Sequence, residues 1–309
     1  MRVSPLSALA EQISEWQAPS SGPSGIPDSV GSIGPELTAK AEKLFRRLIP
    51  LAAASAKETG RTVVSLFGGS GAGKSGTAVL LSRWLRSAGV GCVTVSGDNY
   101  PHRIPLYNDA ERLRIFRVSG TKALRAAGLY SVSVGDALHG LWESGLDADP
   151  KLISAHPWLS VYQEGGKQAL RAYLGTEAEQ DYDELNALLA DFHAGAATLW
   201  LKRMGRTEDE RRYEPADVSG AEVLLLEWTH GGSELLSGAD IPVLLLGSTA
   251  ETLPYRRARN RDSYTDSPFT TMVLDIEQEK LLRRAGSAAL ILTRGGEWTD
   301  AASVMEGLV

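Results

Sequence analysis

The sequence has little that would support a disulfide, a zinc site or a membrane span. Its only cysteine is Cys92, so no disulfide can form within one chain. Its five histidines show no metal-ligand spacing, and no stretch approaches the roughly 18 consecutive apolar residues of a membrane helix. The apolar run in "MRVSPLSALAEQISEW" is too short and too broken for a signal peptide. We therefore expect a cytoplasmic protein that does not enter a membrane.

The sequence also lacks an excess of basic residues. It has 32 Lys and Arg against 38 Asp and Glu, a net charge of -6, which predicts no general binding to nucleic acid. It has no G-x-S-x-G motif, so a hydrolase with a serine nucleophile on such a turn has no support. No feature fixes the oligomeric state, and a homo-oligomer is compatible with the sequence.

The composition is that of a globular protein with one unusual segment near its start. Of the 309 residues, 43% are apolar and 23% are charged. Residues 18–35, "APSSGPSGIPDSVGSIGP", are mostly Pro, Gly and Ser and predict a linker. We therefore divide the chain into an N-terminal segment, 1–34, and one domain, 35–309.

Continuous apolar runs of strand length alternate with helical patterns in this domain, which predicts an α/β fold with a parallel sheet flanked by helices. The predicted strands are 62–67, 91–97, 222–227, 241–247 and 288–293, and the predicted helices between them include 74–87 and 268–284. Residues 107–221 show mainly helical patterns, best over 181–204, and predict a large helical insertion that forms a substrate or lid region.

The stretch "FGGSGAGKSG" follows the first of these strands and precedes a helix. It fits G-x-x-x-x-G-K-[ST], a loop whose backbone N–H groups surround phosphates. Lys74 is placed to reach the β- and γ-phosphates of a nucleotide, and the Ser75 hydroxyl to bind Mg²⁺. The fold is therefore predicted to be of the P-loop NTPase type. The predicted nucleotide-binding residues are Gly68, Gly69, Ser70, Gly71, Ala72, Gly73, Lys74, Ser75 and Gly76.

The same letters contain a second motif, G-x-G-x-x-G, at Gly71, Gly73 and Gly76. With Asp98 as the acid that binds a ribose, it would indicate a dinucleotide-binding protein. That interpretation puts a Lys-Ser pair inside the motif and leaves the first two glycines of the loop unexplained, so we favour the triphosphate.

The second strand ends in "SGDNYPHR" (96–103), which brings a carboxylate to the carboxyl edge of the sheet. Asp98 could accept a proton from a hydroxyl that attacks the γ-phosphate, or it could bind Mg²⁺. The alternative is a local turn in which the Asp-Asn pair caps its own backbone. Residues close behind it could line an acceptor pocket, namely Tyr100, His102 and Arg103.

A third motif, "VLLLEWTHGG" (223–232), places Glu227 at the tip of a buried strand. A carboxylate at such a tip commonly serves the Mg²⁺ site of a P-loop protein. Alternatively, the strand simply ends at a polar residue. His230 follows in the loop and is a candidate for substrate binding.

The three motifs, in this order, resemble the phosphoribulokinase and uridine kinase group of P-loop kinases, which also includes bacterial-type pantothenate kinase. The resemblance implies that Lys74 and Ser75 bind ATP and Mg²⁺, that Asp98 is the catalytic base, and that Glu227 lies near metal and substrate. It covers the sheet-forming parts and not residues 107–221.

A fourth stretch, "YRRARNRD" (255–262), resembles the Arg-rich lid helix of that group, which implies that Arg257 and Arg261 contact the nucleotide. A solvated basic face is the alternative. We therefore expect an ATP-dependent kinase that transfers the γ-phosphate to a hydroxyl of a small metabolite. A regulatory P-loop protein that hydrolyses nucleotide without a small-molecule acceptor is the alternative function.

Overall fold

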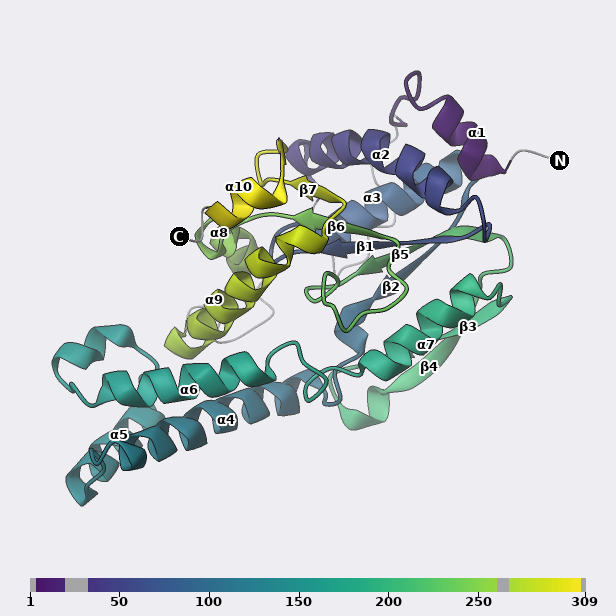
Figure 1. Ribbon diagram of the computed structural model, residues 1–309. Coiled ribbons are helices and arrows are strands. Elements are labelled where there is room, and N and C mark those ends of the chain that lie inside the picture. Colours follow the sequence, from purple (N-terminus) through teal and green to yellow (C-terminus); the bar gives the residue numbers. More distant parts are fainter. Residues whose placement is uncertain (1–3, 20–32, 260–266, 307–309) are drawn as a thin grey trace. The chain divides into compact units, whose positions relative to one another are not determined.

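The computed structural model describes residues 4–19, 33–259 and 267–306 (Figure 1). They form two compact units. The first comprises the described residues up to Tyr100, then Asp181–Thr252, and those from Leu281 onward. The second comprises Pro101–Gln180 and Leu253–Lys280, so the segment predicted as an insertion, 107–221, is shared between the two units.

A six-stranded sheet forms the centre of the first unit. Its strand order is β2-β5-β1-β6-β7-β8, and all neighbours are parallel except β7 and β8, which are antiparallel. The sheet confirms the predicted parallel α/β fold, and only the short β8 was not predicted. The strands are β1 (Thr62–Phe67), β2 (Gly91–Ser96), β5 (Ala221–Glu227), β6 (Ile241–Leu245), β7 (Leu290–Leu292) and β8 (Trp298–Thr299).

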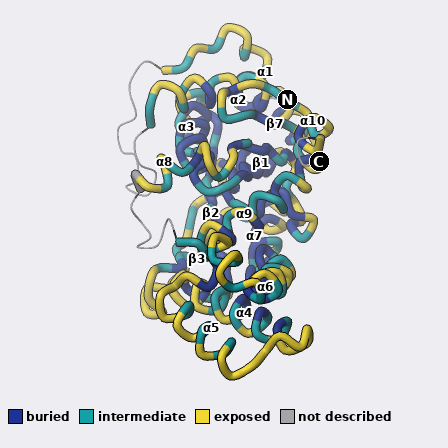
Figure 2. The backbone as a smooth tube through the Cα atoms, turned by 90° about the vertical axis from the view of Figure 1, so that its left-hand side faces the viewer, coloured by how far each residue is buried: buried dark blue, intermediate teal, exposed yellow. Residues whose placement is uncertain are grey.

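Successive residues of the central strands supply two cores, because side chains alternate between the faces of a sheet. Val64 and Leu66 pack with α1 (Pro5–Glu11), α2 (Pro35–Ser55) and α3 (Lys74–Ser87) on one face. Val63 packs with α7 (Tyr182–His193) on the other. Figure 2 shows β1 as buried. Elements near the C-terminus are η4 (Arg284–Ser287) and α10 (Ala301–Glu306), and the 3-10 turn η1 (Gly97–Asn99) follows β2.

The helix predicted over 181–204 ends early, and the prediction is wrong from residue 194 onward. After α7 the chain forms an antiparallel pair, β3 (Thr198–Arg203) and β4 (Arg212–Asp217), with the turn η3 (Glu208–Glu210) between them. Leu199 and Leu201 are buried while Trp200 between them is 62% exposed. This alternation is the period of a strand, and Gly195, with φ of 87°, supplies the break after the helix.

The second unit consists of helices around its own apolar core (Figure 1). α4 and α6 approach each other closely at two glycines. A side chain on Gly120 would collide with the Tyr162 ring, and one on Gly166 would collide with the Phe116 ring. α5 is mostly exposed (Figure 2). The helices that lie wholly in this unit are α4 (Pro105–Ala126), α5 (Val132–Ser144), η2 (Pro150–Ser154) and α6 (Leu159–Tyr173). The unit also includes the part of α8 (Thr249–Arg259) after Thr252 and the part of α9 (Pro268–Arg283) up to Lys280.

The start of the chain is tied to the first unit by α1, whose Leu6 and Leu9 are buried. Most of the predicted linker, residues 20–32, lies outside the described residues. Within the part of the chain that the structure describes, no helix has both the length and the apolarity to cross a membrane.

Candidate active site

The phosphate loop connects β1 to α3, as predicted. Gly68 has φ of 152°, and a Cβ atom there would collide with the backbone oxygen of Leu245. Gly73 has φ of 94° and precedes the first residue of α3. Only glycine adopts such backbone angles without strain. The loop therefore brings backbone N–H groups and a helix N-terminus together, which is the arrangement that binds phosphate.

Lys74 begins α3 and is 8% exposed. Its Nζ donates to the backbone oxygens of Gly68 (2.9 Å) and Gly69 (3.1 Å). The ammonium therefore lies inside the curve of the loop. A phosphate oxygen could replace these carbonyl acceptors, with a stronger charge-assisted hydrogen bond.

Glu227 connects the phosphate loop to the end of β2, because β5 lies between β1 and β2 in the sheet. It ends β5 in register with Ser96 at the end of β2. Its Oε2 accepts from the Ser75 hydroxyl (2.8 Å) and its Oε1 from the Ser96 hydroxyl (2.6 Å). The structure thus brings together Ser75 and Glu227, two of the predicted Mg²⁺ ligands.

Electrostatics place Asp98 in the same site. Burial raises the pKa of Glu227, and the negative charge of Asp98 raises it further. The charge of Lys74 and the two serine hydroxyls act in the opposite direction. The two carboxylates disfavour each other's charge and Lys74 favours the charge of Glu227, and a cluster of groups that perturb one another in this way is typical of a functional site.

Asp98 itself is exposed at the edge of the sheet, in the turn η1. Asn99 makes the local contacts of this turn: its side chain donates to Ser96 O (3.3 Å) and accepts from Met204 N (3.0 Å). Gly97 precedes Asp98, and any side chain at position 97 would collide with the Trp228 ring. The neighbours therefore fix the turn, and the Asp98 carboxylate stays accessible to a ligand.

Two of the candidate substrate residues are buried. Tyr100 is 1% exposed and belongs to the core that includes Trp228. His230 is 4% exposed and meets the Trp228 ring edge-on at 5.3 Å. Both contribute to packing around Trp228, and their predicted role in substrate binding stays a prediction.

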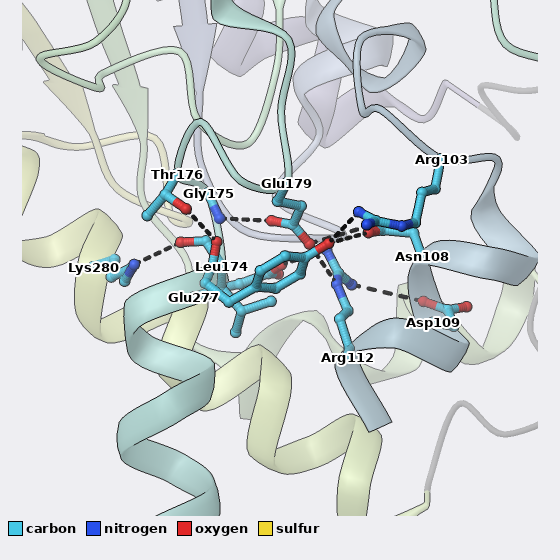
Figure 3. A network of polar contacts seen from close by, with 11 residues as sticks. Arg103, Asn108, Asp109, Arg112, Leu174, Gly175, Thr176, Glu179, Glu277 and Lys280 are labelled. Atoms are coloured by element: carbon cyan, nitrogen blue, oxygen red, sulfur yellow. Dashed lines mark hydrogen bonds and ion pairs between the residues drawn. The ribbon is translucent and has the colours of Figure 1, made fainter. Parts of the chain in front are cut away.

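His102 and Arg103 belong to the second unit. His102 is exposed, and its ring Nε2 lies 2.9 Å from the backbone oxygen of Glu177. Arg103 donates to the Tyr173 hydroxyl (3.2 Å), which continues into a network around Glu179 (Figure 3). The predicted role of both residues in binding an acceptor stays a prediction.

Glu179 is the centre of that network and is fully buried. Its Oε1 accepts from Arg112 Nε (2.7 Å) and Asn108 Nδ2 (3.2 Å), and its Oε2 accepts from Gly175 N (2.6 Å) (Figure 3). Arg112 also reaches Glu277 on α9 (3.4 Å). The network fixes α4, α9 and the segment after α6 to one another within the second unit.

The Arg-rich stretch is described only in part. Arg257 lies in α8, in the second unit, and is exposed. Arg261 lies outside the described residues. The helix begins with a capping box, in which the side chains of Ser248 and Glu251 each accept a hydrogen bond from the other residue's backbone N–H. The contact of these arginines with nucleotide stays a prediction.

Three residues near the phosphate loop were not predicted from the sequence. Ser96 is one, and it ends β2 level with Glu227 on the neighbouring strand. Arg294 follows β7 and donates to Gly71 O in the loop (3.2 Å). Lys40 on α2 is 6% exposed. A lysine within the apolar face of a helix is the signal that could have indicated Lys40.

The residues present fit Mg²⁺. Among the described residues, no group of three or more His, Cys, Asp and Glu side chains could hold a metal ion by itself. Mg²⁺ usually binds through one or two protein oxygens together with substrate phosphates. Ser75 and Glu227 offer a hydroxyl and a carboxylate 2.8 Å apart beside the phosphate loop, which is a donor set of this kind.

Comparison with known proteins identified one relative with substantial sequence identity. The bifunctional α-galactosidase/sucrose kinase AgaSK of Mediterraneibacter gnavus is 39% identical over 236 residues, which cover 76% of this chain. The chain spans only 20% of the length of that relative. No family model matches the chain.

Solved structures of kinases resemble the chain at low identity. A putative fructose transport system kinase from Silicibacter sp. TM1040 has a TM-score of 0.45 and 15% identity, over 80% of this chain and 94% of that chain. A possible uridine kinase from Bacillus stearothermophilus has a TM-score of 0.43 and 14% identity, over 83% and 98%. The motifs, their geometry and the similarity to AgaSK are consistent with a P-loop kinase of the phosphoribulokinase and uridine kinase group.

Proposed function

We propose that this protein is an ATP-dependent kinase that transfers the γ-phosphate to a hydroxyl of a small molecule. The observation that carries the proposal is the Ser75–Glu227 hydrogen bond, 2.8 Å long, between the phosphate loop and the tip of β5. With the charges of Lys74 and Asp98 acting on Glu227, it supports a site where triphosphate, cation and acceptor meet.

Each residue has a role that follows from its position. The backbone of the phosphate loop and Lys74 would bind the β- and γ-phosphates and hold them still. Ser75 and Glu227 would hold Mg²⁺, which supplies positive charge where negative charge develops on the phosphoryl group. Ser96 orients Glu227 through its hydrogen bond of 2.6 Å and is a positioning residue.

Asp98 is the proposed base. Its carboxylate is exposed at the sheet edge, so an acceptor hydroxyl can reach it. As the acceptor oxygen bonds to the γ-phosphorus, the hydroxyl proton passes to the Asp98 carboxylate. The bond between the γ-phosphorus and the bridging oxygen breaks, and ADP carries away the electron pair.

We further propose a saccharide as the acceptor class. AgaSK is named for two activities, α-galactosidase and sucrose kinase. Of these two, the kinase activity is the one that a phosphate loop such as residues 68–75 serves, whereas a typical glycosidase relies on a pair of carboxylates. The similarity of this chain therefore supports the kinase activity and makes sucrose and related sugars the first acceptors to test.

The test is acceptor-dependent ADP release from ATP and Mg²⁺. The panel would contain sucrose, other sugars, nucleosides, amino alcohols, pantothenate and phosphosugars, with Lys74→Ala as the inactive control. We expect one acceptor class, the sugars, to stimulate ADP release. ATP hydrolysis that no acceptor stimulates would contradict the proposal and favour the regulatory alternative.

A further inference from the structure

A pocket of about 460 Å³ lies in the second unit, and its volume is typical of sites for small molecules. It is lined by five residues of α4 and one of α5, namely Arg114, Arg117, Val118, Thr121, Lys122 and Trp142. None of them belongs to the candidate active site, whose phosphate loop and carboxylates are part of the first unit. The pocket is therefore a second place where this chain can hold a ligand.

The sequence of α4 makes one wall of this pocket basic. Residues 112–126 contain five Arg or Lys and no Asp or Glu. Positions 114, 117, 118, 121 and 122 are separated by steps of three and four residues and therefore share one face of the helix. No acidic side chain of the described residues lines the pocket, so the wall suits a ligand with negative charge.

Two of the three cations on this wall are held in place by carboxylates. Arg117 donates to both oxygens of Asp147, which is 1% exposed, at 3.1 Å each. Arg114 donates to both oxygens of Glu111 (2.7 and 2.8 Å). These bonds use Nε and Nη2 of each guanidinium, so its Nη1 group can still donate to a ligand.

Lys122 gives the pocket an uncompensated positive charge. It is exposed and forms no ion pair with any residue that the structure describes. Asp147 and Glu111 balance the two arginines, so one positive charge remains. A phosphate group in the pocket would gain charge-assisted hydrogen bonds from Lys122 and from the two Nη1 groups.

Trp142 provides an aromatic wall with a fixed orientation. Its Nε1 donates to the Tyr162 hydroxyl (2.8 Å), which donates in turn to Asp147 (2.8 Å). The Arg117 guanidinium lies 5.4 Å from the centroid of the indole. Because the protein already orders these groups, a ligand that uses them loses little binding energy to ordering.

The two kinds of wall together select the ligand. The indole and Val118, which is 39% exposed, offer apolar surface that can pack against the C–H groups of a sugar ring. Inorganic phosphate would leave this surface uncovered, and a neutral sugar would leave Lys122 without a partner.

We propose that this pocket binds a phosphorylated saccharide, with the phosphate at Lys122 and the two arginines and the sugar ring against Trp142. The negative charge and the apolar contact follow from the pocket itself. The choice of a saccharide rests on the proposed function, since it takes the body of the ligand from the proposed acceptor class. The site would hold the ligand without transferring a group to or from it.

Binding calorimetry without nucleotide tests the proposal, with glucose 6-phosphate, glucose and inorganic phosphate as the probes. Lys122→Gln removes the uncompensated charge. Arg125→Gln is the matched control, because Arg125 is exposed in the last turn of the same helix and does not line the pocket. Lys74→Ala shows whether the probe binds at the phosphate loop instead. Thermal unfolding of each variant verifies that it is folded.

We expect the wild type to bind glucose 6-phosphate more tightly than either glucose or inorganic phosphate. Lys122→Gln should weaken this binding about tenfold, as for loss of one charge-assisted hydrogen bond. Arg125→Gln and Lys74→Ala should bind the probe as the wild type does.

Three results would overturn the inference. The first is that the wild type does not bind glucose 6-phosphate, or that Lys122→Gln binds it equally well. The second is loss of binding in Lys74→Ala, because the phosphate loop would then be the site. The third is inorganic phosphate binding as tightly as glucose 6-phosphate, because the sugar ring would then make no contact. These measurements contain no ATP, so failure of the proposed function is recognised separately, by ADP release that no sugar stimulates.

Discussion

Lys40 should destabilise the folded protein. Burial, followed by the charge of Arg294, lowers its pKa from 10.5 to about 8, a difference of about 2.5 units, and each unit corresponds to about 1.4 kcal/mol. At pH 7 the lysine is charged in both the folded and the unfolded chain, so the whole penalty of about 3 kcal/mol applies. Lys40→Met replaces the charged side chain by an apolar one of similar length, and should therefore raise the free energy of unfolding by about this amount.

The dependence on pH follows from the sign of the shift. Between pH 8 and 10.5 the unfolded chain binds more protons than the folded one, so wild-type stability rises with pH through this window relative to Lys40→Met. The difference between the two proteins should shrink from about 3 kcal/mol at pH 7 to about 1 kcal/mol at pH 10. Other titrating groups are common to both proteins and cancel in the comparison.

Urea unfolding, followed by tryptophan fluorescence at pH 7 and pH 10 without nucleotide, measures this difference. Lys43→Met serves as the control and should unfold at the wild-type midpoint, because Lys43 is exposed. The reasoning would be refuted if Lys40→Met were no more stable than wild type at pH 7. The reasoning would also be refuted if the stability gained by Lys40→Met were the same at pH 7 and pH 10.

Three further predictions concern the site and the second unit. Asp98→Asn should lower kcat by about 10²–10⁴ if Asp98 is the base, and a loss below tenfold in steady-state turnover would assign it a positioning role. Burial raises the pKa of Glu227 above 4.5, so the folded state binds more protons than the unfolded state in the window above pH 4.5. Stability relative to Glu227→Gln should therefore fall as pH rises through that window, and parallel pH profiles in thermal unfolding would contradict this. Glu179→Ala leaves Arg112 without its 2.7 Å partner and should cost about 3–5 kcal/mol in urea unfolding, whereas an unchanged midpoint would show that Glu277 and Asp109 suffice.

The sheet and the phosphate loop could be predicted because their signals are local. Strands buried on both faces appear as continuous apolar runs, as in "TVVSLF", and the loop needs its glycines and Lys-Ser at fixed positions. The pairing of Ser96 with Glu227 could not be predicted with equal ease. It depends on the register of β2 with β5, two strands that are more than a hundred residues apart in sequence.

The hairpin β3–β4 and Lys40 were missed for physical reasons. Residues 194–204 carry apolar side chains that fit a helical period and a strand period equally over so short a stretch, and packing against α7 decides between them. Lys40 falls on the apolar face of α2, between Leu37 and Leu44, but a lysine at such a position commonly extends its side chain along the surface to water. Only the tertiary structure shows that α2 turns this position toward the phosphate loop, where burial changes its energetics.

The most direct test of the central claim is the mass of the product formed from ATP, Mg²⁺ and sucrose, with the other sugars of the panel in parallel. The account predicts an acceptor that gains one phosphoryl group, about 80 Da, together with one ADP for each product molecule, and neither with Lys74→Ala. ADP formed together with free phosphate, and no acceptor of increased mass, would contradict it.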